Sequence, residues 1–254
     1  MLTPPSRLDG AILAARYAYM PNKLRYCGGD ANSELFAYIA NESSDNGLKN
    51  LLKEFATMYP YLRLIAESNG ILDPFDYRVV EAYWLGNELL NTVSMKNFYR
   101  YLIDEQKLKK KLNSKITEKV FGKIPLGVKP HHSWHVLNIP KRTGHYAVEH
   151  TLETMDQCRI SWAQIKKIES SIGQMATTIK VETQPLVAEG NKIALGPAVK
   201  KNIWADGNNG LLTNSVREGD WLAVHWNWAC DILSAKQVEN LKKWTIYNLK
   251  IANI

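Results

Sequence analysis

A cysteine and a histidine in separate segments of this 254-residue chain are the side chains best suited to chemistry. They are Cys158 in "MDQCRISWAQIKKIE" and His225 in "GDWLAVHWNWACDIL". Thiolate and neutral imidazole both bind transition metals, and imidazole also carries protons. A structural interpretation stays open for each: a histidine whose ring nitrogens bond the backbone, and a cysteine that packs as a small apolar residue.

The local structure expected around these residues affects how accessible they are. The segment around His225 reads as one β-strand, in which His225 shares a face with Asn227. Trp226 and Trp228 would continue the opposite face. Cys158 stands where a helix gives way to a strand, and such a junction can expose the sulfur.

A second group of candidates lies in "PHHSWHVLN", which holds half of the six histidines: His131, His132 and His135. The prolines on either side favour an extended piece, in which His131 and His135 would share a face. A linker whose histidines cap neighbouring helices is the simpler interpretation. The alternative is a metal site, which Glu81 of an aromatic-rich helical segment would complete as a His/carboxylate iron centre.

A third candidate is Cys27 in "RYCGGDANSE". The glycines after it indicate a tight turn that leads into a helix capped near Asn32 or Ser33. A turn chosen for its glycines is one interpretation, and an exposed thiol at a helix N-terminus, with a lowered pKa, is the other. Cys230 is expected to lie in the core.

Composition is typical of a soluble globular protein, with 45% hydrophobic and 22% charged residues. Neither a membrane-spanning apolar run nor an apolar signal core is present, which predicts a cytoplasmic protein without a membrane partner. Three scattered cysteines do not form a disulfide framework, so free thiols are expected. Phosphate loops, G-x-S-x-G elbows, CxxC pairs and H-E-x-x-H helices are all missing, which argues against nucleotide enzymes and simple hydrolases.

The first half of the chain has helical spacing. We expect an all-α domain over residues 1–124, with Asp73 and Ser94 as N-caps of two of its helices. The net charge of +7 arises largely from Glu105 to Ile124, which reads as one amphipathic helix with a solvated basic face. Nucleic-acid binding by that run is the weaker interpretation, because basic charge alone reads no bases.

The second half changes pattern. Residues 125–157 are a His-rich connection with a short helix, and residues 158–254 alternate strand-like runs with turns before a last amphipathic helix. Ser234 and Gln237 have the spacing of a capping box at the start of that helix. The fold class is therefore α+β, with a small β-barrel or sandwich after the helical domain.

The C-terminal part resembles the HypC/HupF family of [NiFe]-hydrogenase assembly chaperones. These proteins begin with a cysteine, continue into a strand, and later carry a Gly-Asp-aromatic-apolar-x-Val-His segment before a C-terminal helix. Cys158 stands where the family's cysteine would, and the second motif is matched in order by Gly219, Asp220, Trp221, Leu222, Val224, His225 and Ala229.

The resemblance implies a small OB-like barrel followed by a helix. It also implies that Cys158 and His225 hold an iron centre bearing cyanide and carbon monoxide, and that the partners are other maturation factors and the hydrogenase large subunit. The chain departs from the family in three places. Cys158 is internal, Trp162 and Ala163 stand where the family has Pro-Gly, and Asn227 replaces a glycine.

Three functions follow as hypotheses. The first is a scaffold or chaperone for the iron–cyanide–carbonyl unit, with His225 as a ligand shielded by tryptophans. The second is an iron-dependent enzyme that uses the histidine cluster and Glu81, and that could supply a ligand for the same cofactor. The third and weakest is a basic OB-like binder of single-stranded nucleic acid.

Overall fold

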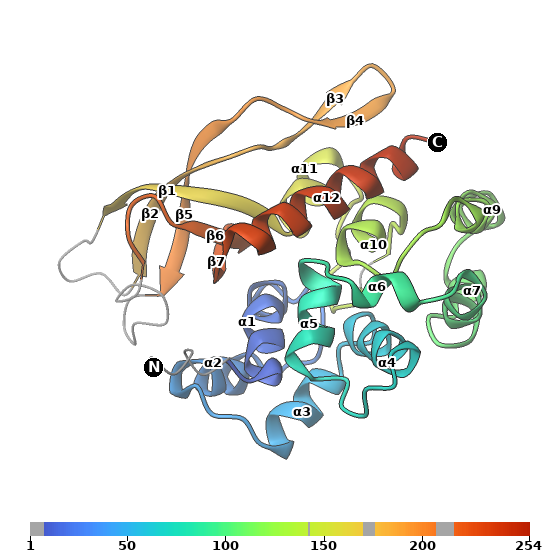
Figure 1. The fold of residues 1–254 in the computed structure, drawn as a ribbon, viewed down its shortest axis with the longest axis horizontal. Coiled ribbons are helices and arrows are strands. Elements are labelled where there is room, and N and C mark those ends of the chain that lie inside the picture. The colour runs from blue at the N-terminus through green and yellow to red at the C-terminus, as the bar shows by residue number, and fades with distance from the viewer. Residues whose placement is uncertain (1–7, 142, 170–175, 207–215) are drawn as a thin grey trace.

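A computed structural model describes residues 8–141, 143–169, 176–206 and 216–254, and it is mixed α and β (Figure 1). Helices form the N-terminal part, as the periodicity predicts. A sheet and one long terminal helix form the rest. The helices are α1 (Gly10–Lys23), α2 (Asn32–Asn41), α3 (Asn46–Lys53), α4 (Met58–Ser68), α5 (Tyr77–Trp84), α6 (Leu89–Thr92), α7 (Met95–Asp104), α8 (Leu108–Lys111), α9 (Ser114–Gly122), the 3-10 turn η1 (Ile124–Leu126), α10 (His132–Asn138), α11 (Leu152–Cys158) and α12 (Ala235–Ala252).

Five strands pair in the order β1-β2-β5-β7-β6, and β6 pairs in turn with β1. The parallel pairing of β5 with β7 has one ladder position, Trp204 with Trp228. A separate β3–β4 hairpin extends beyond them over the C-terminal end of α12 (Figure 1). The strands are β1 (Ser161–Glu169), β2 (Ala176–Thr183), β3 (Leu186–Glu189), β4 (Lys192–Leu195), β5 (Val199–Asp206), β6 (Trp221–His225) and β7 (Trp228–Leu233).

The two faces of β6 serve two different cores. Leu222 and Val224 join a cluster inside the five strands, together with residues such as Ile179 and Ile203. Ala223, on the other face, belongs to the large core that the helices build. That core includes residues of α1, α5 and α12, so the face of β6 that carries Ala223 and His225 is turned toward the helical part.

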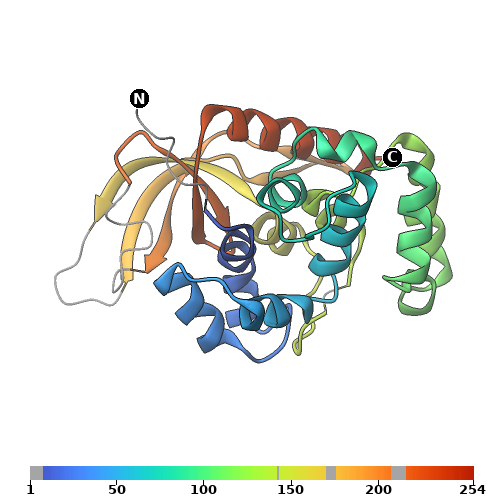
Figure 2. The same cartoon turned by 60° about the horizontal axis from the view of Figure 1, so that its bottom comes forward.

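α12 covers the seam between the sheet and the helices (Figures 1 and 2). Its predicted capping box is confirmed, because Ser234 Oγ accepts from the Gln237 amide and Gln237 Oε1 accepts from the Ser234 amide. Trp244 of α12 lies over Gly86, where a Cβ would stand 1.9 Å from the indole Cδ1. Gly86 has φ +86°, a left-handed conformation that favours glycine. The close approach of Trp244 and the left-handed backbone therefore both require glycine at position 86, where α12 packs against the end of α5.

Three local predictions need correction. The N-cap of α5 is Asp76, three residues after the predicted Asp73, because Asp73 accepts from the Phe75 amide in a preceding turn. The basic segment forms two helices, α8 and α9, rather than one. The strand around His225 ends at that residue, and Trp226 and Asn227 form a hairpin turn with φ of 52° and 58°. Trp228 therefore starts the next strand and packs in the helical core.

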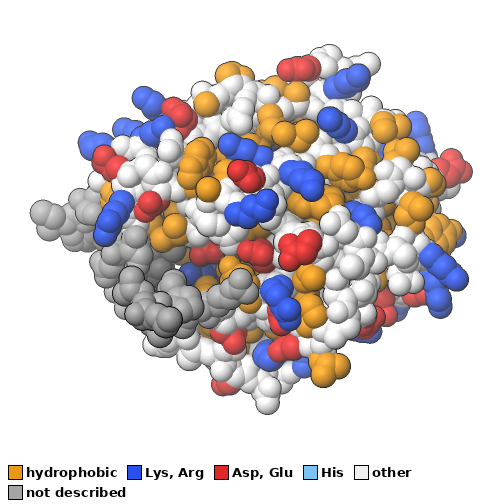
Figure 3. Space-filling view, viewed as in Figure 1, with side chains coloured by type: hydrophobic (Ala, Val, Ile, Leu, Met, Phe, Trp, Pro, Cys, Tyr) orange, Lys and Arg blue, Asp and Glu red, His pale blue; other side chains and the backbone are white. Residues whose placement is uncertain are grey.

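Ser94 does cap α7, with its hydroxyl accepting from the Asn97 amide. Lysine side chains of α8 and α9 are exposed, as the amphipathic pattern predicts. On the face shown in Figure 3, basic and acidic side chains are interspersed and do not form a continuous basic stripe. In the described residues no helix is long and apolar enough to cross a bilayer.

A half-buried acidic group joins α1 to the sheet. Asp231 of β7 lies 3.7 Å from Arg16 Nη1, while Arg16 Nη2 bonds Glu42 at 2.7 Å. Burial raises the pKa of the Asp231 carboxyl to about 6, against the lowering effect of Arg16. Above that pH the ionised carboxylate therefore lowers the free energy of unfolding. Apolar packing, and not this ion pair, holds α1 against the sheet.

We predict that the stability of Asp231→Asn relative to wild type increases as pH rises. A carboxyl with a raised pKa stabilises the fold below its unfolded pKa of 3.8 and loses that contribution as pH rises through about 6. Relative to Asp231→Asn, the wild-type free energy of unfolding should fall by about 1.4 kcal/mol per pH unit across this window. Urea unfolding of both proteins between pH 3.5 and 8 measures the difference. A pH-independent difference would contradict the prediction.

Candidate metal centre

Three buried donors from three elements meet between the helices and the sheet. His132 begins α10, Cys158 ends α11 and His225 ends β6. The ligand atoms that they offer all lie within 4.8 Å of one another. Around a tetrahedral ion with bonds of about 2.0–2.3 Å, nitrogen and sulfur ligands stand roughly 3.5 Å apart. Small side-chain movements would bring this group, the His132/Cys158/His225 triad, to that spacing.

His225 is oriented by the helical part of the chain. Its Nδ1 donates to the carbonyl oxygen of Tyr17 in α1 at 2.7 Å. A carbonyl only accepts, so Nδ1 carries the proton and Nε2 presents the lone pair that binds metals. The hairpin turn that follows is tied to α11, because the amide of Trp226 donates to the carbonyl of Gln157 at 2.8 Å. This bond brings His225 next to Cys158.

His132 is held from both ring nitrogens. Its Nε2 donates to the carbonyl of Cys158 at 2.8 Å, and the hydroxyl of Tyr83 donates to Nδ1 at 3.0 Å. Burial, and then the nearby His225, hold the pKa of His132 well below its usual range. The neutral ring is the form that binds a metal. Coordination through either nitrogen would replace one of these two hydrogen bonds.

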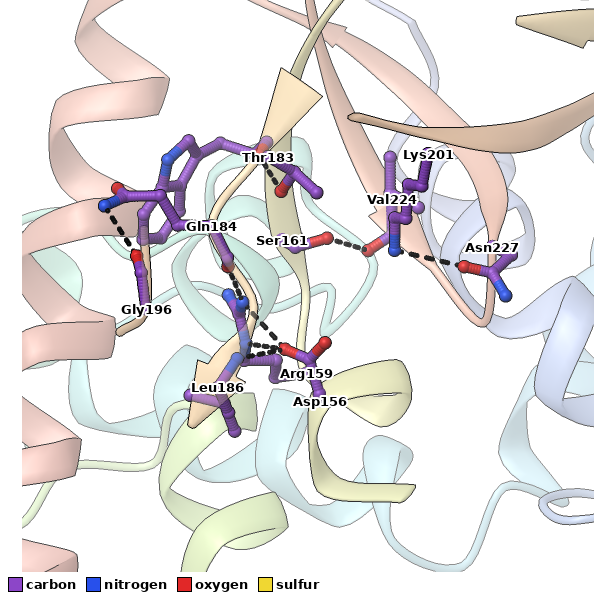
Figure 4. A network of polar contacts seen from close by, with 11 residues as sticks. Asp156, Arg159, Ser161, Thr183, Gln184, Leu186, Gly196, Lys201, Val224 and Asn227 are labelled. Carbon is purple, nitrogen blue, oxygen red and sulfur yellow. Dashed lines mark hydrogen bonds and ion pairs between the residues drawn. The ribbon is translucent and has the colours of Figure 1, made fainter. Parts of the chain in front are cut away.

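Cys158 is fixed by the residue that follows it. Arg159 is buried and bonds Asp156 in the same helical turn and the carbonyl of Gln184 beyond β2 (Figure 4). The Asp156 carboxylate also accepts from the Leu186 amide at 2.9 Å, which joins α11 to β3. The expected exposure of the sulfur is wrong. Cys158 is only 4% exposed, because α11 packs in a cluster with α10 and α12.

A cavity of about 40 Å³ lies against the triad. A cavity needs roughly 10–15 Å³ to hold one water molecule, so this cavity has space for a metal ion or a small ligand. Apolar and aromatic side chains form much of its wall, with further polar groups from the helical part. It is lined by Ala18, Pro21, Cys27, Phe55, Thr57, Met58, Tyr83, Trp84, His132, His135, Lys141, Thr143, Cys158 and His225.

The predicted extended piece around the histidine cluster is wrong, because His132–Asn138 is the helix α10. Pro130 precedes the N-cap, His131, and Pro140 follows the C-cap, Ile139. A proline interrupts a helix only from inside it, so this pair bounds α10 instead of breaking it. His131 does cap a helix, because its ring accepts from the Ser133 amide at 3.1 Å. The helix that it caps is α10, which follows it directly, and not a neighbouring helix as predicted.

The predicted His/carboxylate site does not assemble. Only His132 of its four residues joins the triad. His131 stacks on Trp244 at 6.1 Å, and His135 bonds the Tyr61 hydroxyl at 3.2 Å on the cavity wall. Glu81 accepts from Asn87 and Gln237, both at 2.9 Å, between α5 and α12. The acidic residue of the predicted site therefore stabilises the packing of two helices.

The remaining candidates divide between the cavity and the scaffold. Cys27 is half-buried and lines the cavity, but it is not at a helix N-terminus, because α2 begins five residues later with Ala31 as an N-cap that offers no side chain. Asp220 accepts from the Arg217 amide at 2.7 Å in the turn before β6. Cys230 is buried in the core, as predicted.

Sequence reasoning missed the aromatic wall of the site. Trp84 lies 4.5 Å from the His132 ring and 5.6 Å from the His225 ring, and Tyr83 bonds His132. Both end α5, in "VVEAYWLG", whose pattern signals only a buried helix face. The tryptophans beside His225 in sequence lie elsewhere: Trp226 packs on Tyr26, and Trp228 on Tyr19.

Residues 6–254 match the family of unknown function DUF6390, and the chain belongs to that family. The match spans the helical part and the sheet alike. No curated protein and no solved structure matches the chain.

Proposed function

We propose that this DUF6390 protein binds one transition-metal ion at the His132/Cys158/His225 triad and acts as a scaffold in metallocofactor assembly. The observation that carries the proposal is the convergence of a thiol and two imidazoles from α11, α10 and β6 on one buried cavity. Two of these donors, Cys158 and His225, are those that the resemblance to HypC/HupF proteins implies. A thiolate with two imidazoles is a donor set suited to iron or zinc.

The cofactor that we propose is iron, with cyanide and carbon monoxide as further ligands, in the maturation of [NiFe]-hydrogenase. Three protein donors leave coordination positions open, and the adjacent cavity offers space for small ligands. The partners would be other maturation factors and the hydrogenase large subunit. We further propose that the five strands are an OB-like barrel of the kind in the resembled family. Asn227 supports this assignment, because at φ 58° it occupies a conformation that glycine, its counterpart in that family, readily adopts.

His132 gives the helical part of the chain a role in this proposal. It is a donor from outside the strands, and α1 and α5 hold the triad through the Tyr17 carbonyl and the Tyr83 hydroxyl. A scaffold with a third protein donor retains the metal more firmly than one with two. The helical part would thus complete the site that the strands begin.

Anaerobic purification of wild type and Cys158→Ala, from a host that makes the maturation factors, tests the proposal. We expect bound iron, with infrared bands in the cyanide and carbonyl stretching region, in wild type and in the control Cys230→Ala. Both signals should be lost in Cys158→Ala, because Cys230 lies outside the cavity and Cys158 lines it.

Iron without those infrared bands would overturn the hydrogenase assignment and leave a metal site. Equal metal content in wild type and Cys158→Ala would overturn the triad itself. The Cys230→Ala control separates the loss of a ligand from the loss of a buried thiol, because both sulfurs are almost fully buried.

A further inference from the structure

A second cysteine, Cys27, lines the cavity that the triad borders. Cys27 lies in the loop between α1 and α2 and lines the same cavity as Cys158, His132 and His225, although its sulfur lies outside the group of donors that are within 4.8 Å of one another. Of the three cysteines it alone is not buried. The cavity is therefore lined by a buried cysteine from the end of α11 and a half-buried cysteine from the loop between α1 and α2.

The loop presents Cys27 from a fixed backbone. Asn22 at the end of α1 donates its side-chain amide to the carbonyls of Cys27, at 3.0 Å, and Gly29, at 2.7 Å. Gly28 has φ +79°, and a Cβ there would stand 2.6 Å from the Phe55 ring. The amide of Gly144 donates to the carbonyl of Tyr26 at 2.9 Å from the other side. Together these contacts fix the position of the backbone that carries Cys27.

We propose that Cys27 is a fourth ligand of the metal, and the one through which the ion enters and leaves the site; this inference rests on the proposed function. With the triad it makes a set of two thiolates and two imidazoles, which closes a tetrahedral shell around the ion before cyanide and carbon monoxide bind. When a hydrated divalent ion binds, its waters leave and the Cys158 and Cys27 thiols release their protons to solvent. Dissociation of the Cys27 sulfur reopens one position for a small ligand or for a donor from a partner protein.

Differences in solvent exposure favour Cys27, rather than another residue of the cavity, as the ligand that dissociates when the ion enters or leaves. His135 also lines the wall, but its ring is buried and bonds the buried Tyr61 hydroxyl. The triad residues are each held by hydrogen bonds to backbone or, for Cys158, by the buried Arg159 that follows it. Cys27 is the donor on this wall that combines a thiol with access to solvent.

Titration with Co²⁺ tests the assignment, because the near-ultraviolet sulfur-to-cobalt absorption scales with the number of bound thiolates. We compare wild type with Cys27→Ser, Cys158→Ser and the control Cys230→Ser. Cys27→Ser should keep about half of the wild-type absorption per bound ion and should release Co²⁺ to a chelator at least about tenfold faster, since even loss of an outer-shell partner weakens metal binding 10- to 100-fold. Cys230→Ser should match wild type.

A measurement on the wild-type protein makes the test independent of how the variants fold. Alkylation of Cys27, followed by mass spectrometry, should be fast in metal-free protein and slow in the Co²⁺-bound protein. Equal alkylation in both states, or a Cys27→Ser variant with wild-type absorption and release, would overturn the role of Cys27 and leave the triad intact. A wild-type protein that binds no Co²⁺ would overturn both this inference and the proposed function.

Discussion

Replacing His225 with glutamine is expected to abolish metal binding while the protein stays folded. Glutamine can still donate to the Tyr17 carbonyl, which the Nδ1 of His225 does at 2.7 Å. It removes the Nε2 lone pair, so the triad loses one of its two imidazoles. Loss of a direct ligand should lower the affinity by more than the 10- to 100-fold that outer-shell changes typically cost. Titration with Co²⁺, with circular dichroism as the folding check, measures both effects.

His145→Gln is the matched control for this variant. His145 is half-exposed and lies 3.1 Å from Asp30, outside the cavity, so its loss should leave Co²⁺ affinity unchanged. A His225→Gln protein that binds Co²⁺ as tightly as His145→Gln would contradict the triad. Equal losses in both would indicate that the metal binds to surface histidines.

Local signals in the sequence predicted the helices well because caps and periodicity depend on near neighbours. Ser94 and Ser234 each accept from an amide three residues later, a contact that spacing alone reveals. Turn residues between short apolar runs also predict strands in the second half, although this pattern sets neither the number of the strands nor their pairing. The hairpin turn after His225 was missed, because it uses a tryptophan at φ 52°, where glycine or asparagine is the usual signal.

The site was predicted only in part, because its contacts join distant segments. The family resemblance pairs Cys158 with His225, whereas the histidine pattern assigns His132 to a different site. Backbone groups connect these residues. The Cys158 carbonyl accepts from the His132 ring, and the Gln157 carbonyl accepts from the amide of Trp226, the residue after His225. Backbone groups carry no sequence signature, so neither contact could be read from residue types. The aromatic wall from α5 could not be predicted for a related reason. The apolar spacing of a buried helix face is the same whether that face packs against a metal site or against other core residues.

Replacing Trp84 with alanine should destabilise the fold strongly. Trp84 is buried and stacks on Tyr17 with ring centroids 5.2 Å apart. Removing so large a buried ring typically costs about 3–5 kcal/mol of unfolding free energy. Urea unfolding with a chelator present isolates this packing contribution from that of a bound metal. Trp84→Phe keeps a six-membered ring and should lose less.

The same substitution should also weaken the metal centre, although Trp84 offers no ligand. Its ring packs against both imidazoles, with its centroid 4.5 Å from that of His132 and 5.6 Å from that of His225. Without it both imidazoles gain space to turn away from Cys158, and water can reach the donors. Co²⁺ affinity should therefore fall in the order wild type, Trp84→Phe, Trp84→Ala, the same order as stability. If Trp84→Ala lost stability but bound Co²⁺ as wild type does, hydrogen bonds would suffice to orient the two histidines: those to the Tyr17 and Cys158 carbonyls and that from the Tyr83 hydroxyl. The aromatic wall would then stabilise the fold without contributing to metal binding.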